Sequence, residues 1–247
     1  MPKRFLYEED PRNASLYSLV NAGGFTSWTI DRTGNNQVGF ANTVSVSAWA
    51  KTTSNSAGFS MLLNVKEDSG ANAISLRRPS GNTFQVLLVG SNGTSVKDYR
   101  VAAWTIAAWV HIAVTWNGTT LLLYVNGVLA VPTKPTDDAV TLISSGGRVI
   151  TFAGDSGALN WLGNIGHTAI WNSVLSAAAI ASIHNPPSGL PFDADLRNSF
   201  GSYSAAGSLI QYWKPGWTVG DVVAPVVGLA FNSSTVDSTD IDEDAPA

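Results

Sequence analysis

The sequence predicts an all-β protein, a sandwich of two antiparallel sheets, and two observations carry that prediction. Between Trp109 and Trp116 large apolar residues occupy every second position, which is the period of a strand with two distinct faces. β-prone runs of this kind recur at spacings of about ten residues with glycine-containing turn signals between them, as in an all-β sandwich. We expect one buried face to be shared by Val110, Ile112, Val114 and Trp116.

The strongest part of the pattern is an antiparallel meander over residues 109–131. Asn117-Gly118 and Asn126-Gly127 separate three β-prone runs, and both residue types tolerate the positive φ that tight hairpin turns need. Before the meander we expect strands near residues 43–51, 59–65, 74–77, 83–89 and 95–101. After it we expect two short strands between residues 137 and 157.

One helix is predicted, over residues 177–184. Ser176 is a suitable N-cap because its hydroxyl can accept a hydrogen bond from a free N–H of the first turn. Asn185-Pro186-Pro187 ends the helix, since proline cannot continue it.

Composition excludes several kinds of partner. The formal net charge is −4, whereas a nucleic-acid partner would require a basic patch. Charged residues make up 13% of the chain, about half the usual share. The surface must therefore be rich in Ser, Thr, Asn and Gly, which suits contact with sugars or neighbouring subunits. There is no cysteine for disulfides, no apolar stretch long enough to span a membrane, and no apolar core of a signal peptide in the first ten residues.

Three landmarks resemble the laminin-G-like branch of the concanavalin A-like lectin/glucanase jelly rolls. They are the meander from Trp109 to Gly127, the run Val44 to Trp49, and the segment Ile165 to Ile183, which resembles a closing strand with its short helix. The resemblance covers residues 40–185 or so and implies a two-sheet jelly roll. It identifies a fold more than a function, because this fold hosts enzymes, lectins, adhesion modules and spacers.

The chain is expected to have four parts. Residues 1–13 form an N-terminal arm, 14–190 the jelly roll, 191–221 a patterned extension, and 222–247 an acidic flexible tail. The extension resembles a segment that follows laminin-G-like domains in structural proteins of phages and marine viruses. Here it ends in Tyr212-Trp213-Lys214-Pro215-Gly216-Trp217.

No catalytic residue is predicted, and we expect no enzymatic activity. Glucanases of the resembled fold carry carboxylates at alternate strand positions, and a retaining pair stands about 5–5.5 Å apart. After Glu67 the next glutamate is Glu243, in the tail. The alternating acids of residues 240–244 therefore lack a rigid support. The three histidines, His111, His167 and His184, do not have the spacing of a zinc site.

Ligand-binding candidates are few. Calcium binds many members of the resembled family, but Gly166-His167 stands where they often have Asp-Glu, so we expect no cofactor and keep calcium as the less favoured alternative. Asp155, Asn164 and His167 remain candidate ligand-binding residues at this rim. Trp28 and Trp104 lie in loop-like contexts and are the candidates for stacking against a sugar. Trp49, Trp116 and Trp171 are expected in the core.

Two functions follow. The first is a non-enzymatic virion component of a bacteriophage, a capsid decoration or tail-associated subunit assembled in the bacterial cytoplasm. Its partners would be other virion subunits, itself included as a homo-oligomer, and not nucleic acid or membrane. The assembly contacts would come from the termini, through Phe5, Leu6, Tyr7, Tyr212, Trp213 and Trp217. The apolar residues of the extension could instead fold back on the sandwich. The alternative function is a carbohydrate-binding adhesion module, extracellular or at the cell surface, whose partner is a glycan.

Overall fold

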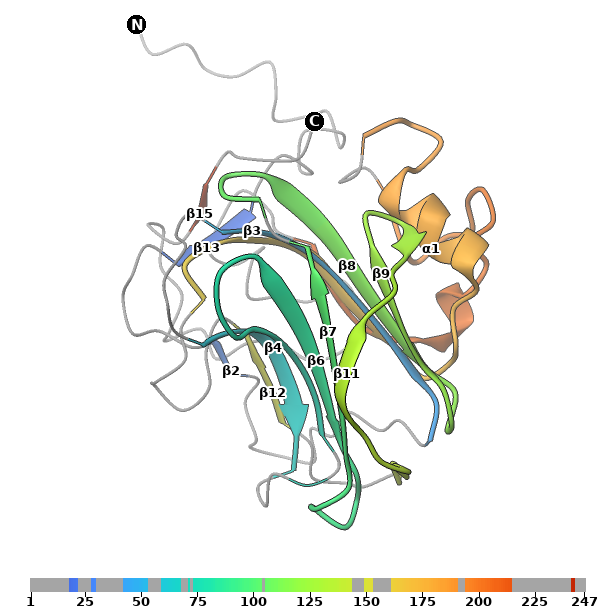
Figure 1. Ribbon diagram of the computed structural model, residues 1–247. Helices are drawn as coiled ribbons and strands as arrows, with labels where there is room; N and C mark the ends of the chain where they lie inside the picture. The colour runs from blue at the N-terminus through green and yellow to red at the C-terminus, as the bar shows by residue number, and fades with distance from the viewer. Residues whose placement is uncertain are drawn as a thin grey trace, which may run out of the picture.

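The computed structural model describes residues 18–21, 28–29, 42–52, 59–67, 71, 73–103, 105–143, 149–152, 161–190, 194–214 and 241–242. In these residues the chain forms two antiparallel sheets packed face to face, with a single α-helix, α1, on the outside of one of them (Figure 1) and a short 3-10 helix at Ala206–Ser208. The predicted two-sheet antiparallel jelly roll is confirmed.

The larger sheet has eight strands. Its path runs β10 (Val128–Leu129), β9 (Leu121–Val125), β8 (Trp109–Trp116), β3 (Val44–Thr52), β13 (Gly163–Trp171), β1 (Ser18–Asn21) and β15 (Ile241–Asp242). β14 (Leu209–Trp213) also pairs with β13. The predicted meander is the β8–β9–β10 part of this sheet, and Asn126 and Gly127 at its second turn have φ of 49° and 77°.

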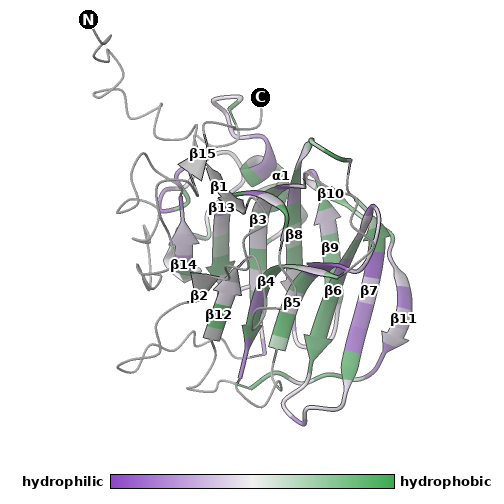
Figure 2. Ribbon diagram, turned by 90° about the vertical axis from the view of Figure 1, so that its left-hand side faces the viewer, coloured by the Kyte–Doolittle hydropathy of each residue, from purple (hydrophilic) through white to green (hydrophobic). Residues whose placement is uncertain are grey.

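The smaller sheet has seven strands. They follow the order β11 (Thr133–Asp137), β7 (Val96–Ala102), β6 (Thr83–Val89), β5 (Ala73–Arg78), β4 (Ser60–Lys66), β12 (Val149–Phe152) and β2 (Trp28–Thr29). Figure 2 shows these strands side by side, with hydrophilic residues gathered on β7 and β11. Core residues occupy every second position along β5 and β6, namely Ile74, Leu76, Phe84, Val86 and Leu88, so one side of this sheet faces the core and the other faces outward.

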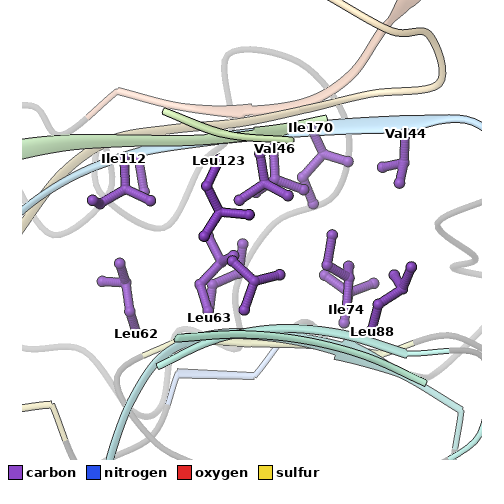
Figure 3. Packing of buried hydrophobic residues seen from close by; sticks show 14 of the residues in the cluster. Val44, Val46, Leu62, Leu63, Ile74, Leu88, Ile112, Leu123 and Ile170 are labelled. Atoms are coloured by element: carbon purple, nitrogen blue, oxygen red, sulfur yellow. The ribbon is translucent and has the colours of Figure 1, made fainter. Parts of the chain in front are cut away.

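The main core lies between the two sheets. Val110, Ile112, Val114 and Trp116 all belong to it, as the period-two pattern predicts. Figure 3 shows Ile112 and Leu123 of the larger sheet pointing toward Leu62 and Leu63 of the smaller one. Burying each such side chain contributes about 1.5–3 kcal/mol to folding, so this apolar layer is the main stabilising element.

A second, smaller core covers the outer face of the larger sheet. Helix α1 (Ala177–His184) begins after Ser176, whose Oγ accepts the N–H of Ala179 at 3.1 Å, as predicted for an N-cap. Its buried side chains, Ile180 and Ile183 among them, pack against residues of β13 and of the segment 194–212. Of the predicted core tryptophans, Trp171 lies in this second core and Trp116 in the main one, and Trp49 is buried as well.

The extension after residue 190 takes part in this packing. Tyr212 and Trp213 of β14 are buried, and the Tyr212 hydroxyl donates to the carbonyl of Ala194 at 2.8 Å. Their apolar surface is thus covered within the molecule and is not available for the subunit contacts expected from the sequence. For Tyr212 and Trp213 the structure shows the alternative, in which the extension folds back on the sandwich. Phe5, Leu6, Tyr7 and Trp217 lie outside the described residues.

β11 was not expected at its observed position. It contains Pro135, which lacks an N–H and is a poor strand former, and its pairing with β7 shifts register between Thr133 and Thr136. Proline is tolerated there because β11 is an edge strand and only one side of it is hydrogen-bonded. Of the described residues between 138 and 152, only Val149–Phe152 form a strand.

Candidate functional site

The outer face of the seven-stranded sheet carries two rows of side chains set by strand register. One row crosses the sheet through Thr151, Asn64, Ser75, Leu87, Asp98 and Thr136. The next row runs through Met61, Arg77, Gln85, Arg100 and Thr133. Because these residues alternate with the core residues of their strands, they point away from the core. We call Arg77, Gln85, Asp98, Arg100 and Thr133 the polar face.

A chain of hydrogen bonds fixes the polar face. Arg77 Nε donates to Gln85 Oε1 at 2.8 Å, and Gln85 Nε2 donates to Asp98 Oδ1 at 2.6 Å. Arg100 donates to both oxygens of Asp98, through Nε to Oδ1 at 3.0 Å and Nη2 to Oδ2 at 2.5 Å. Thr133 on β11 donates to the carbonyl of Arg100 at 3.3 Å. These contacts hold planar polar groups in fixed orientations, because each has a partner on a neighbouring position of the sheet.

The electrostatics of the polar face follow from these contacts. Burial alone would raise the pKa of Asp98, but hydrogen bonds from Arg100 and Gln85 outweigh it and lower the pKa below the ordinary aspartate value. Asp98 is therefore ionised near neutral pH. Burial lowers the pKa of Arg77, Asp98 opposes that effect, and the charge of Arg100 adds to it. Both guanidinium groups are cationic, since arginine in proteins stays protonated.

An open groove adjoins the polar face. It has a volume of ≈ 530 Å³ and is lined by Pro79, Ser80, Thr83, Arg100, Val101, Ala102, Val131 and Thr133. Thr83 and Ala102 are paired across β6 and β7, one row beyond Gln85 and Arg100. Val131 is 93% exposed. The groove thus combines hydroxyl and guanidinium groups with exposed apolar surface.

An aromatic ring lies at the opposite end of the polar face. Phe59 is 49% exposed, and the guanidinium carbon of Arg77 lies 5.3 Å from its ring centroid. This cation–π contact orients the Arg77 side chain from one side, while Gln85 holds it from the other. Phe59 also presents exposed apolar surface against which a ligand could pack.

The two described candidates proposed from sequence lie elsewhere. Asn164 and His167 are on β13 of the other sheet and are 2% and 5% exposed. His167 Nδ1 lies 3.4 Å from the Tyr212 hydroxyl, and burial, reinforced by Lys214, lowers the pKa of His167 well below its ordinary value. Trp104, Asp155 and the side chain of Trp28 lie outside the described residues.

No metal or membrane feature appears in the part of the chain that the structure describes. There, no three His, Asp or Glu side chains are grouped closely enough to share a metal ion. No helix among those residues has the length and apolar character needed to cross a membrane.

Sequence reasoning missed the polar face, although a signal was present. Only 13% of the residues are charged, yet Arg77, Asp98 and Arg100 all fall on predicted strands, and Asp98 and Arg100 are two residues apart on one of them. Residues two apart on a strand share a face, so Asp98 and Arg100 were predictable as neighbours on one face of β7. What the pattern could not give was the order β5–β6–β7–β11, which brings Thr133 next to Arg100.

Comparisons with known proteins agree with this architecture. A laminin-G family model described as the concanavalin A-like lectin/glucanases superfamily matches residues 23–181. No curated protein sequence matches the chain.

Solved structures of similar fold are distant in sequence. A heptameric SAP-like pentraxin from Limulus polyphemus has a TM-score of 0.53 at 11% identity, with 91% of this chain and 95% of that one covered. The CBM40 of a Ruminococcus gnavus IT-sialidase, bound to α2,3-sialyllactose, has a TM-score of 0.53 at 16% identity, over 69% and 98%. A putative carbohydrate-binding protein from Bacteroides ovatus has a TM-score of 0.52 at 14% identity, and the match spans 80% of this chain and about half, 51%, of that one. At these identities the likeness concerns the fold.

Proposed function

Because the chain belongs to the concanavalin A-like lectin/glucanases superfamily, we propose that it is a non-enzymatic carbohydrate-binding protein whose site is the polar face with its groove. The observation that carries this is the hydrogen-bonded series Arg77, Gln85, Asp98 and Arg100 beside an open groove of ≈ 530 Å³. Sugar hydroxyls both donate and accept hydrogen bonds, and side chains already held in place bind them with little loss of conformational freedom.

The composition of the groove supports a sugar as its occupant. Thr83 and Thr133 offer hydroxyls, while Pro79, Ala102 and Val131 offer apolar surface. Sugar rings have the same mixture, with polar edges and faces of C–H groups. Two of the three similar structures described above are carbohydrate-binding by their own descriptions, which fits the proposal. A protein of this kind acts where polysaccharides are, outside the cell or on its surface.

The chemistry of the polar face favours binding over hydrolysis. Glycoside hydrolysis commonly uses two carboxyl groups on opposite sides of the scissile bond. On the outer face of β5, β6 and β7 the only carboxylate is that of Asp98, and it is bonded by Arg100 and Gln85. A carboxylate held in this way, with its pKa lowered, is a poor proton donor.

The virion role stays a prediction. Its main support came from the terminal segments, and residues 1–17 and 215–240 lie outside those that the structure describes. None of the three similar structures named above is described as a virion protein.

A glycan array followed by isothermal titration tests the proposal. We expect the full chain to bind at least one polysaccharide class, and the double variant Thr83→Val, Thr133→Val to bind it with lower affinity. Losing a hydrogen bond costs about 1 kcal/mol, so each substitution should reduce affinity about fivefold. Thr119→Val, at an exposed position on the turn between β8 and β9, is the matched control and should bind like the wild type.

Two results would count against the proposal in different ways. If the wild type retains no glycan, the proposed function is wrong. If it binds glycans but the double variant binds equally well, the site lies elsewhere on the molecule.

A further inference from the structure

The two arginines of the polar face have unused hydrogen-bond donors. Arg77 donates through Nε to Gln85, and Arg100 donates through Nε and Nη2 to Asp98. Within the described residues, both terminal nitrogens of Arg77 and Nη1 of Arg100 donate to no protein acceptor. Since a guanidinium carries five N–H donors, a fork of donors remains on Arg77.

The charge on this face is unbalanced toward positive. On the outer face of β5, β6 and β7 the charged residues are Arg77, Asp98 and Arg100, two cations and one anion. The carboxylate of Asp98 is bonded to Arg100 and Gln85, which leaves Arg77 without a carboxylate partner among the described residues. The chain as a whole has a net charge of −4, so this surface is a local exception.

The geometry is suited to one sugar with an acidic group. Arg77 and Arg100 flank Gln85 on adjacent strands, and two strand spacings separate their backbones by about 10 Å. Arg77 is oriented by Phe59 on one side and Gln85 on the other. Two oxygens of a carboxylate or a sulfate can accept two parallel hydrogen bonds from such a fork, and these charge-assisted bonds are stronger than neutral ones.

We infer that the polar face recognises an acidic sugar, whose carboxylate or sulfate group is bound by the terminal nitrogens of Arg77. Arg100 adds a further donor and positive charge, and Phe59 contacts the apolar side of the ring. This inference rests on the proposed function and names the substrate class of the same site.

Matched ligand pairs test it by isothermal titration with the full chain. One pair is an oligogalacturonate and its methyl ester, which differ in the charge of the carboxyl group. A second is sialyllactose and lactose, and a third is a sulfated lactose and lactose. We expect an acidic member to bind at least tenfold more tightly than its neutral partner. The difference should shrink at high salt, because Arg77 is partly exposed and salt screens its attraction for an anion. Whether carboxylate or sulfate gives the larger ratio identifies the acidic group.

Two substitutions at Arg77 and one control complete the test. Arg77→Gln removes the charge but can still donate to Gln85, and we expect it to lose about tenfold in affinity for the acidic ligand and little for the neutral one. Arg77→Lys keeps the charge without the fork, so its loss should be intermediate. Arg197→Gln is the control, because Arg197 is an exposed arginine bonded to Asp195 outside both sheets. Thermal unfolding of each variant checks that it is folded.

The possible outcomes distinguish recognition of an acidic sugar from carbohydrate binding in general. Equal affinity for acidic and neutral members, or unchanged acid preference in both Arg77 variants, overturns the inference while the carbohydrate-binding function stands. Failure to bind any glycan overturns both.

Discussion

His111 is a buried titratable residue in the larger sheet, away from the polar face. It lies on β8, and its Nε2 is 2.7 Å from Ser47 Oγ on the paired strand β3. Its ring packs against Trp49 and His184, with centroids 5.0 and 5.6 Å away. Burial, followed by the charge of His184, lowers the pKa of His111 to about 3. Its Nδ1 has no hydrogen-bond partner in the described part of the molecule, so protonation would bury an unsatisfied donor.

This residue should make stability depend on mild acid. The unfolded chain protonates His111 near the ordinary histidine pKa of 6.5, whereas the folded chain keeps it neutral down to about pH 3. The free energy of unfolding should therefore be fully retained above pH 6.5. As pH falls from 6.5 toward 3, His111 by itself should lower the free energy of unfolding by about 1.4 kcal/mol per pH unit. His111→Gln should reduce the slope between pH 6 and pH 5 by about that amount, measured by denaturant titration.

The slope, not the absolute stability, is the readout, because the substitution also removes ring contacts with Trp49. Ser47→Ala keeps the histidine and should keep most of the slope. A wild type whose stability is flat between pH 6 and pH 5 would contradict the lowered pKa of His111.

At the scale of elements, strand pairing depends on close backbone approach at Gly163. This residue begins β13 with φ of 138°, in a region that side-chain-bearing residues rarely adopt. A Cβ placed there would lie 1.9 Å from the carbonyl oxygen of Lys51 on β3, its paired neighbour strand. β13 and β3 are central strands of the larger sheet, so the absence of a side chain at this point allows the sheet to form.

Gly163→Ala should destabilise the protein by about 3 kcal/mol or more, because both the backbone conformation and the contact with Lys51 are incompatible with a methyl group. Gly207→Ala is the matched control: a Cβ there meets nothing within 4 Å. It should change stability by about 0.5 kcal/mol or less. The measurement is the unfolding midpoint in guanidinium chloride, and similar midpoints for the two variants would contradict this account of the β3–β13 pair.

At the scale of the whole molecule, the segment after residue 190 completes the larger sheet and its outer layer. β14 pairs with β13, and Leu196, Tyr203, Leu209 and Tyr212 join the second core with helix α1. The Tyr203 hydroxyl accepts from Trp171 Nε1 at 3.0 Å and donates to the Leu196 carbonyl at 2.7 Å, so the segment is fastened by polar contacts too.

A chain ending at residue 190 should therefore lose stability. Removing the segment would expose to water the side chains of α1 and β13 that pack against it, including Trp171 and Ile183. We expect reduced solubility, binding of the dye ANS and a broadened unfolding transition by circular dichroism. The full-length chain is the control. A truncated chain that is monomeric and unfolds like the full-length chain would mean that residues 191–247 add little to the fold.

The sequence by itself determined the local structure. Alternation over Trp109–Trp116, the two Asn-Gly turns and the Ser176 cap each depend on a few consecutive residues, and all are confirmed. Which residues of one strand lie on the same face follows from the same local geometry, and the core residues of β8 could therefore be predicted. β11 was the local exception, since Pro135 is acceptable only at a sheet edge, and edges are not visible in sequence.

Only the tertiary structure decided which distant segments meet. The polar face joins residues 77, 85, 98, 100 and 133 because strand order and register place them in adjacent rows, and Asn164 and His167 are buried in the other sheet for the same reason. The sequence likewise did not show what Tyr212 and Trp213 pack against. An apolar cluster looks the same in sequence whether it packs on its own sandwich or on another subunit. Local periodicity fixes which way a side chain faces along its strand, while long-range pairing fixes what it faces.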